Sequence, residues 1–158
     1  LRTEPIRGNV ETRMGKVNAG LFDATLLAEA GLTRLDMKDV TRYPISEEII
    51  VPAPGQAAIA VQTRDEDGEL QTLLQQIHDA KTEREVTIER SLLKRLGGGC
   101  ALPLGCVCHI EGETAELRVF YANASGTEHY LATHRTPLSD IDTLLSQLIE
   151  HLQHITTA

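Results

Sequence analysis

The stretch LKRLGGGCALPLGCVCH holds all three cysteines of the chain, Cys100, Cys106 and Cys108. Cys100 follows three consecutive glycines, which provide no side chains to shield its sulfur. A thiol in such a loop is a nucleophile once it is deprotonated, and the nearby Lys94 and Arg95 would favour the thiolate. The residues alone leave two interpretations of Cys100 open, a functional thiol or a structural one.

The other two cysteines give little support for a metal site. The spacing of the three lacks the paired C-x2-C units of structural zinc sites. On a strand, Cys106 and Cys108 would face one side and His109 the other. We therefore expect no metal, with Cys106 and Cys108 as small buried hydrophobic residues. A thiol-redox or metal module remains an alternative that the spacing disfavours.

Three arginines form the second group of candidate residues. Arg7 stands where a strand is expected to end and a helix to begin, Arg13 lies on that helix, and Arg34 follows the next strand–helix step. Ligands of open parallel sheets bind at the carboxyl ends of the strands, where helix N-termini also favour anions. Because guanidinium groups bind carboxylates bidentately, the pattern favours a ligand with several carboxylates. The alternative is that each arginine is a solvated surface residue.

Composition limits the classes of function. The net charge of −8 and the low aromatic content argue against nucleic-acid binding. No apolar run approaches the roughly 20 residues of a membrane span, and no secretory signal opens the chain. Few, clustered cysteines suit a reducing compartment, so we expect a cytoplasmic protein. The first residue is Leu rather than Met, from which we expect a piece of a longer or processed protein.

The first part of the chain predicts an α/β unit with a parallel sheet. Asn9 is an expected helix N-cap, and the helix should stop near residues 18–20. Alternation of strands and helices within about 25 residues implies right-handed parallel crossovers. Residues 40–54 are rich in proline and are expected to form a crossover or hinge. The expected elements are strands at 23–28 and 56–64 and helices at 29–34 and 70–80.

The second part predicts a small α+β unit. Thr82 and Glu85 are expected to form a capping box at the start of a helix that Gly97 closes. Tight turns join the strands that follow, so these should form an antiparallel sheet of three strands. A final amphipathic helix should lie across one face of this sheet. The expected ranges are strands at 102–110, 115–123 and 128–135 and the helix at 138–155.

Several of these stretches together resemble one family. RGNVETR and FDATLLAEAGLTRL resemble the second domain of porphobilinogen deaminase, also called hydroxymethylbilane synthase. PAPGQAAIAVQTR resembles the segment that crosses back to the family's first domain, and ERSLLKRLGGGCALPLG resembles the start of its third domain. The resemblance implies a remainder of a periplasmic-binding-protein-like domain 2 at 1–54, a crossover strand and helix of domain 1 at 55–78, and a cofactor-bearing domain at 79–158.

The resemblance also implies a chemistry. The family is a transferase that joins four porphobilinogen molecules into hydroxymethylbilane during tetrapyrrole and haem biosynthesis. Its primer, a dipyrromethane, is linked by a thioether to the cysteine that matches Cys100. Arginines matching Arg7, Arg13 and Arg34 bind the carboxylates of the primer and of the growing polypyrrole.

The resemblance carries over no catalytic residue, because the family's catalytic aspartate lies in a domain that would precede this chain. The isolated chain is therefore expected to lack turnover. Full-length family members are monomeric, whereas an exposed sheet edge here could pair with a second copy. The alternative function is a non-catalytic module that binds a polycarboxylate ligand through the arginines. Two departures are Ala57 and Ala60, which stand where the family usually has glycine.

Overall fold

The structure is a computed structural model that describes residues 1–99 and 102–156. The chain divides into two compact units, Leu1–Pro44 and Ile45–Ala158, which are described separately below. Within the described residues, no helix combines the length and apolar character needed to span a bilayer.

The first unit contains two short helices. α1, Val10–Asn18, begins at the predicted N-cap Asn9, whose Oδ1 accepts a hydrogen bond of 2.8 Å from the amide of Thr12. α2, Glu29–Arg34, has the predicted bounds. The two helices touch where Gly31 approaches Val10, since a Cβ on Gly31 would lie 3.3 Å from Val10 Cγ2. Gly31 of α2 therefore lies close to the first turn of α1.

The predicted parallel sheet is not found among the described residues. Residues 23–28 and 56–64, which we expected to be strands, carry no strand pairing in the structure. A strand is stable only when a neighbouring segment completes its hydrogen bonds, and no described segment does so for these two. Their apolar side chains Leu26, Ile59 and Val61 are accordingly exposed. The apolar pattern alone could not supply the partner.

The predicted antiparallel sheet of the second unit is confirmed. Its strands are β1, Leu104–Glu111, β2, Thr114–Ala122, and β3, His129–Pro137. They are hydrogen-bonded in the order β1-β2-β3. Cys106 lies opposite Val119 in the β1–β2 ladder, so the second and third cysteines share the face that the helices cover.

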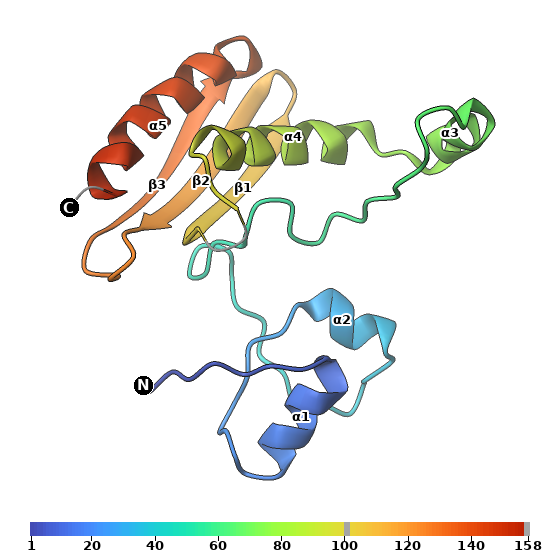
Figure 1. Ribbon diagram of the computed structural model, residues 1–158, viewed down its shortest axis with the longest axis vertical. Helices are drawn as coiled ribbons and strands as arrows, with labels where there is room; N and C mark the ends of the chain where they lie inside the picture. The colour runs from blue at the N-terminus through green and yellow to red at the C-terminus, as the bar shows by residue number, and fades with distance from the viewer. Residues whose placement is uncertain (100–101, 157–158) are drawn as a thin grey trace. The chain divides into compact units, whose positions relative to one another are not determined.

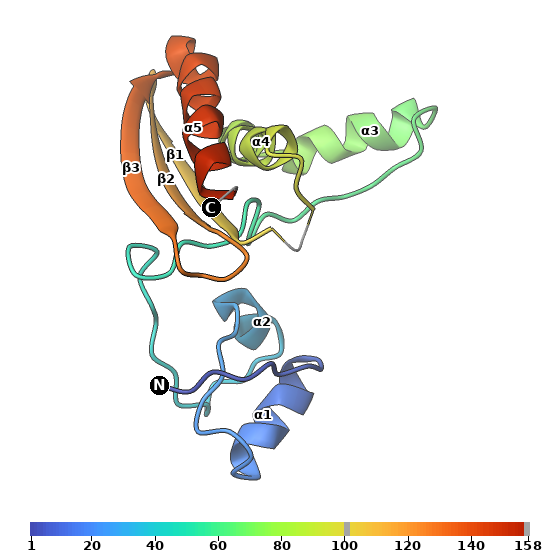
Figure 2. The same cartoon turned by 60° about the vertical axis from the view of Figure 1, so that its left-hand side comes forward.

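Two long helices cover one face of this sheet, as Figures 1 and 2 show. α4, Ala80–Arg95, packs along β1, and α5, Ile141–Thr156, packs along β2 and β3. A single 3-10 turn, Leu138–Asp140, leads into α5. Fully burying a leucine side chain contributes about 1.5–3 kcal/mol, so this layer is the main source of the unit's stability. The largest side chains fully buried in it include Leu92, Leu117, Leu145, Leu152 and Val119.

The start of α4 corrects one prediction. The N-cap is Asp79 rather than Thr82, and its Oδ1 accepts a 2.8 Å hydrogen bond from the amide of Thr82. That bond holds the pKa of Asp79 below its usual value. The predicted capping partner Glu85 instead binds the sheet, as described below. A shorter helix, α3, Gly68–Leu74, precedes α4 and continues as a 3-10 turn at Gln75–Ile77.

Candidate functional site

The connection between α4 and β1 carries the candidate thiol. α4 ends at Arg95, and Gly97 follows in the left-handed region at φ 69°, the conformation expected of a glycine that closes a helix. The amide of Leu102 bonds the carbonyl of Gly99 at 3.1 Å. Cys100 itself lies outside the described residues. What the structure defines is how the two stems of this connection, the end of α4 and the start of β1, are held.

One stem is held by residues 47–55, a segment that runs along β1. Gly105, the second residue of β1, is buried, and a Cβ there would lie 2.6 Å from the carbonyl oxygen of Val51. The next amide, that of Cys106, donates a 2.8 Å hydrogen bond to the carbonyl of Pro52. Only glycine permits this approach of two backbones. The glycine at the end of the GGGCALPLG motif therefore has a packing role.

The same segment also contacts the exposed face of the sheet. Glu47 Oε1 lies 2.7 Å from Nε2 of His109 on β1. The Arg118 guanidinium on β2 donates a 2.8 Å hydrogen bond to the carbonyl of Glu48. Glu47 raises the pKa of His109, because its carboxylate bonds and attracts the protonated ring.

Two glutamates of α4 accept hydrogen bonds from main-chain amides on the free edge of β1. Glu89 is buried and accepts hydrogen bonds from two main-chain amides, Gly55 at 2.6 Å through Oε2 and Cys108 at 2.9 Å through Oε1. Glu85, one turn earlier, accepts a 2.7 Å bond from the amide of Ile110. Burial raises the pKa of Glu89, and the two amide bonds oppose that shift.

These contacts satisfy three alternate amides on the side of β1 that has no strand neighbour. The amides are those of Cys106, Cys108 and Ile110, and their acceptors are Pro52, Glu89 and Glu85. An unpaired strand edge is a template for unwanted pairing, and here side chains and a loop cover it. The acceptors lie on α4 and in the 47–55 segment, so the same hydrogen bonds hold the start of β1 against the helix that leads into the connection.

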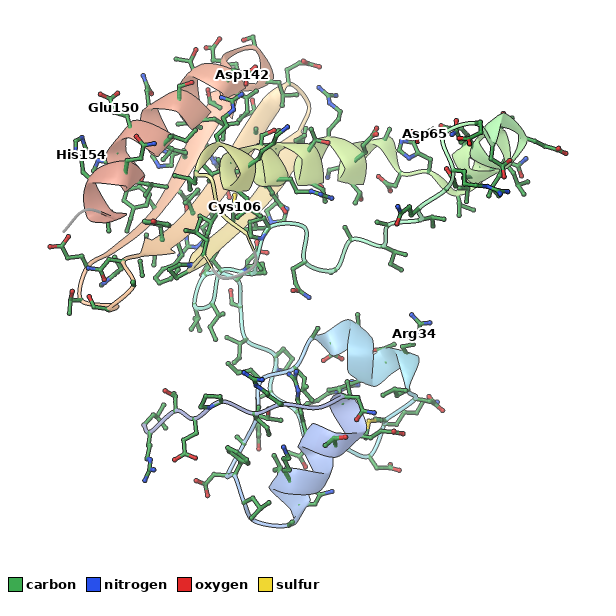
Figure 3. The ribbon with its side chains drawn as sticks, viewed as in Figure 1. Arg34, Asp65, Cys106, Asp142, Glu150 and His154 are labelled. Atoms are coloured by element: carbon green, nitrogen blue, oxygen red, sulfur yellow. The ribbon has the colours of Figure 1, made fainter. Side chains whose placement is uncertain are left out.

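The predicted burial of the second and third cysteines is confirmed. Cys106 and Cys108 are free thiols in the core between sheet and helices, and Figure 3 shows Cys106 where α4 crosses the sheet. Burial raises the pKa of Cys106 strongly and that of Cys108 to about 12. Neither thiol is therefore a nucleophile at neutral pH. In the part of the chain that the structure describes, no group of three or more His, Cys, Asp or Glu residues could hold a metal ion.

Of the two cations expected to favour a thiolate at Cys100, one is already engaged. The guanidinium of Arg95 forms an ion pair with Asp142 at the start of α5. The pair ties the last turn of α4 to α5, whose first turn Asp142 marks in Figure 3. Lys94 is exposed and forms no ion pair within residues 1–99 and 102–156.

In the first unit, Arg7 and Arg13 gather at the N-terminus of α1. Arg13 Nε donates a 2.8 Å hydrogen bond to the carbonyl of Gly8, and Lys16 Nζ donates one of 2.9 Å to the carbonyl of Arg7. Among the described residues, neither arginine has a carboxylate partner, whereas Arg42 is paired with Glu29 at 2.7 Å. The helix dipole adds positive potential at this end. The cluster of Arg7, Arg13 and Lys16 is therefore positively charged and has no ion-pair partner among the described residues.

Arg34 does not join this cluster. It is the last residue of α2, is exposed, and in Figure 3 its side chain is directed away from α1. It likewise has no acidic partner within the described ranges. The structure thus holds the side chains of Arg13 and Lys16 on the main chain of Gly8 and Arg7, and Lys16 was not among the residues predicted for the site.

Two acceptors at the edge of β1 were not predicted as such: Glu85 was expected in a capping box, and Glu89 was given no role. Both lie on the apolar stripe of α4 that includes Leu92, at the spacing of residues that share one helix face. Acidic residues on such a stripe must be buried or bonded, and that periodicity was the available signal. Their acceptor role depends on where β1 packs, which the helix pattern does not contain.

The second unit is a small α+β domain. The connection that carries Cys100 joins α4 to β1, and hydrogen bonds from β1 to Glu85 and Glu89 hold these two elements together. Comparison with family models identifies its class. Residues 1–72 match the porphobilinogen deaminase dipyrromethane cofactor-binding domain, and residues 83–142 match the porphobilinogen deaminase C-terminal domain. The two matches occur in sequence and together cover most of the chain.

The chain belongs to the porphobilinogen deaminase family, as its motifs indicated. The family functions in tetrapyrrole synthesis, acts on porphobilinogen and uses a dipyrromethane cofactor. The charges in the first unit fit such a group, because Arg7 and Arg13 have no carboxylate partner within residues 1–99 and 102–156 and pyrrole acetates and propionates are carboxylates.

Proposed function

We propose that this chain carries the primer-holding part of a hydroxymethylbilane synthase, with Cys100 as the residue that bears the dipyrromethane. The observation that carries the proposal is the burial of the other two thiols of the chain. Cys106 and Cys108 are buried with raised pKa values, so they are unsuited to covalent attachment. Cys100 is the remaining cysteine and follows a glycine run in the motif on which the family resemblance rests.

The bound group would supply the terminal pyrrole carbon to which porphobilinogen units are added. Attachment joins the thiol sulfur to the aminomethyl carbon of a porphobilinogen-derived unit. The C–N bond breaks, and the nitrogen leaves as ammonia with the thiol proton. This chain's contribution is to present that sulfur from the connection between α4 and β1.

The arginines have a separate role in the proposal. Arg7, Arg13 and Arg34 bind the acetate and propionate groups of the cofactor and of the growing polypyrrole. The support is that none of the three has an acidic partner in the described chain. Loss of one charge-assisted hydrogen bond costs about 1.5–3 kcal/mol, so Arg7→Ala or Arg13→Ala should weaken porphobilinogen binding by roughly tenfold or more. Arg2→Ala, which removes an exposed ion pair with Glu4, is the matched control.

Attachment is tested by incubating the chain with porphobilinogen and mapping the adduct by peptide mass spectrometry. Cys100→Ser should abolish the adduct, and Cys108→Ala should retain it. An adduct that persists in Cys100→Ser would move the attachment to another residue. Reversible binding of porphobilinogen with no adduct in the wild type would favour the second function, a non-catalytic module for polycarboxylates.

Turnover is a separate proposal. We expect the isolated chain to form no hydroxymethylbilane, because the resemblance supplies no proton-transferring carboxylate among its residues. Product formation by the purified chain would overturn this expectation and would place a catalytic group within the sequence.

A further inference from the structure

The carboxylate of Glu89 joins three segments that are distant in sequence. It stands on α4, bonds Gly55 in the 47–55 segment, and bonds Cys108 in β1. α4 leads into the connection that carries Cys100, and β1 leads out of it. Glu89 therefore contacts both stems of this connection and the segment against which the second stem packs.

The carboxylate of Glu89 is not stabilised by contact with water, because the residue is buried. Glu89 is only 6% exposed and has no cationic partner in an ion pair among the described residues. Burying a carboxylate is costly unless hydrogen bonds compensate, and here both oxygens accept main-chain amides. An apolar side chain would pack in the same core at no such cost. The geometry favours a role in fixing the relative placement of the three segments.

We propose that Glu89 is a positioning residue for the cofactor-bearing connection: it sets the angle between α4 and β1, and with it the placement of the thiol that the connection carries. This inference rests on the proposed function of Cys100. Glu85 serves as a partial substitute, because it bonds β1 at Ile110 but does not reach the 47–55 segment. Replacing Glu89 should therefore displace the connection more than replacing Glu85 does.

The variants follow from the hydrogen bonds. Glu89→Gln retains one acceptor oxygen and turns the other position into a donor that faces an amide, so it loses one of the two bonds. Glu89→Ala loses both. Glu83→Gln is the matched control, because Glu83 lies on the same helix, is exposed and bonds no main-chain amide of β1.

The first readout is hydrogen exchange at the amides of Gly55 and Cys108. Both should be protected in the wild type. Exchange should be roughly tenfold faster for at least one of them in Glu89→Gln and faster still in Glu89→Ala. Glu83→Gln should match the wild type. Fast exchange at Gly55 in the wild type, or no change in either Glu89 variant, would overturn the proposal. If Glu89→Ala fails to fold, the exchange rates of Glu89→Gln and of the wild type are sufficient to test the proposal.

The second readout is the alkylation rate of each cysteine with iodoacetamide, resolved by peptide mapping on chain that carries no adduct. Loosened stems should raise the rate at Cys100 by about fivefold in Glu89→Gln, a smaller effect than full loss of a charged hydrogen bond. Cys106 and Cys108 should remain unmodified, which reports an intact core. Equal rates at Cys100, or reaction of all three cysteines together, would overturn the positioning role, the latter in favour of a general stabilising one.

The proposed function and this inference fail separately. Absence of an adduct in wild-type chain treated with porphobilinogen would count against the proposed function, and exchange and alkylation would still decide the role of Glu89. If the wild type does form the adduct, Glu89→Gln should load more slowly although its Cys100 is alkylated faster. Slower loading with unchanged alkylation and exchange would overturn the inference.

Discussion

Replacing Gly105 by alanine tests the packing of the 47–55 segment on β1. The added Cβ would lie 2.6 Å from the carbonyl oxygen of Val51 and 2.9 Å from its Cβ. Real Cβ atoms essentially never approach backbone this closely, and the opposing atom is a carbonyl that cannot rotate away. The two backbones must therefore separate, and the hydrogen bond from Cys106 to Pro52 lies directly beside the clash.

The expected cost has two parts. Overpacking a tight contact costs about 1–3 kcal/mol. Weakening the adjacent backbone hydrogen bond adds about 1 kcal/mol. The free energy of unfolding of Gly105→Ala should therefore fall by about 2–4 kcal/mol. At about 3 °C per kcal/mol for a chain of this size, the melting temperature should fall by roughly 6–12 °C.

Urea denaturation followed by circular dichroism measures the change. Gly99→Ala is the matched control, because a Cβ at Gly99 meets no atom within 4 Å and the substitution lies in the same motif. The control should change the free energy of unfolding by less than about 0.5 kcal/mol. If Gly105→Ala is as stable as this control, the 47–55 segment does not pack on β1, and the account of how the connection is held is wrong.

Two further predictions concern the same segment and its continuation. Ala57 has φ 68°, a conformation that costs an L-residue roughly 1–2 kcal/mol, so Ala57→Gly should raise the free energy of unfolding by about 1 kcal/mol after the entropy of glycine is subtracted; a loss of stability in urea denaturation would refute the strained conformation. His109 should titrate above its usual value of 6.5 in an NMR experiment, and Glu47→Gln should lower its pKa. The pKa of His109 is higher in the folded than in the unfolded chain. The pair with Glu47 therefore contributes its full stabilisation below the unfolded pKa, and this contribution is lost as pH rises through the folded pKa. Both groups are about half exposed, which limits the contribution to below about 1 kcal/mol, and an unchanged pKa in Glu47→Gln would show that the two do not interact.

The second unit could be predicted from sequence because its signals are local. Alternation over residues 104–122 and the apolar stripe of the last helix specify a face that must be buried, and the turns EGET and ASGT fix the pairing. The first unit differs. Residues 23–28 have the composition of a covered strand, but a parallel strand needs a partner that its own sequence does not encode.

The candidate site divides in the same way. Cys100 and the arginines could be proposed as site residues because their types and their motifs are visible in the sequence. Glu89 was not, since its function depends on the amides of Gly55 and Cys108, which the fold brings to it from distant parts of the chain. The ion pair of Arg95 with Asp142 is equally non-local. Chemistry that one segment carries can be read from its sequence, and contacts between distant segments cannot.

The most direct test of the central claim is the intact mass of the purified chain, followed by peptide mapping of residues 93–109. The account predicts that any dipyrromethane-sized adduct, as purified or after incubation with porphobilinogen, is found on Cys100, with Cys106 and Cys108 unmodified. An adduct on either buried cysteine, or persistent attachment in Cys100→Ser, would contradict it.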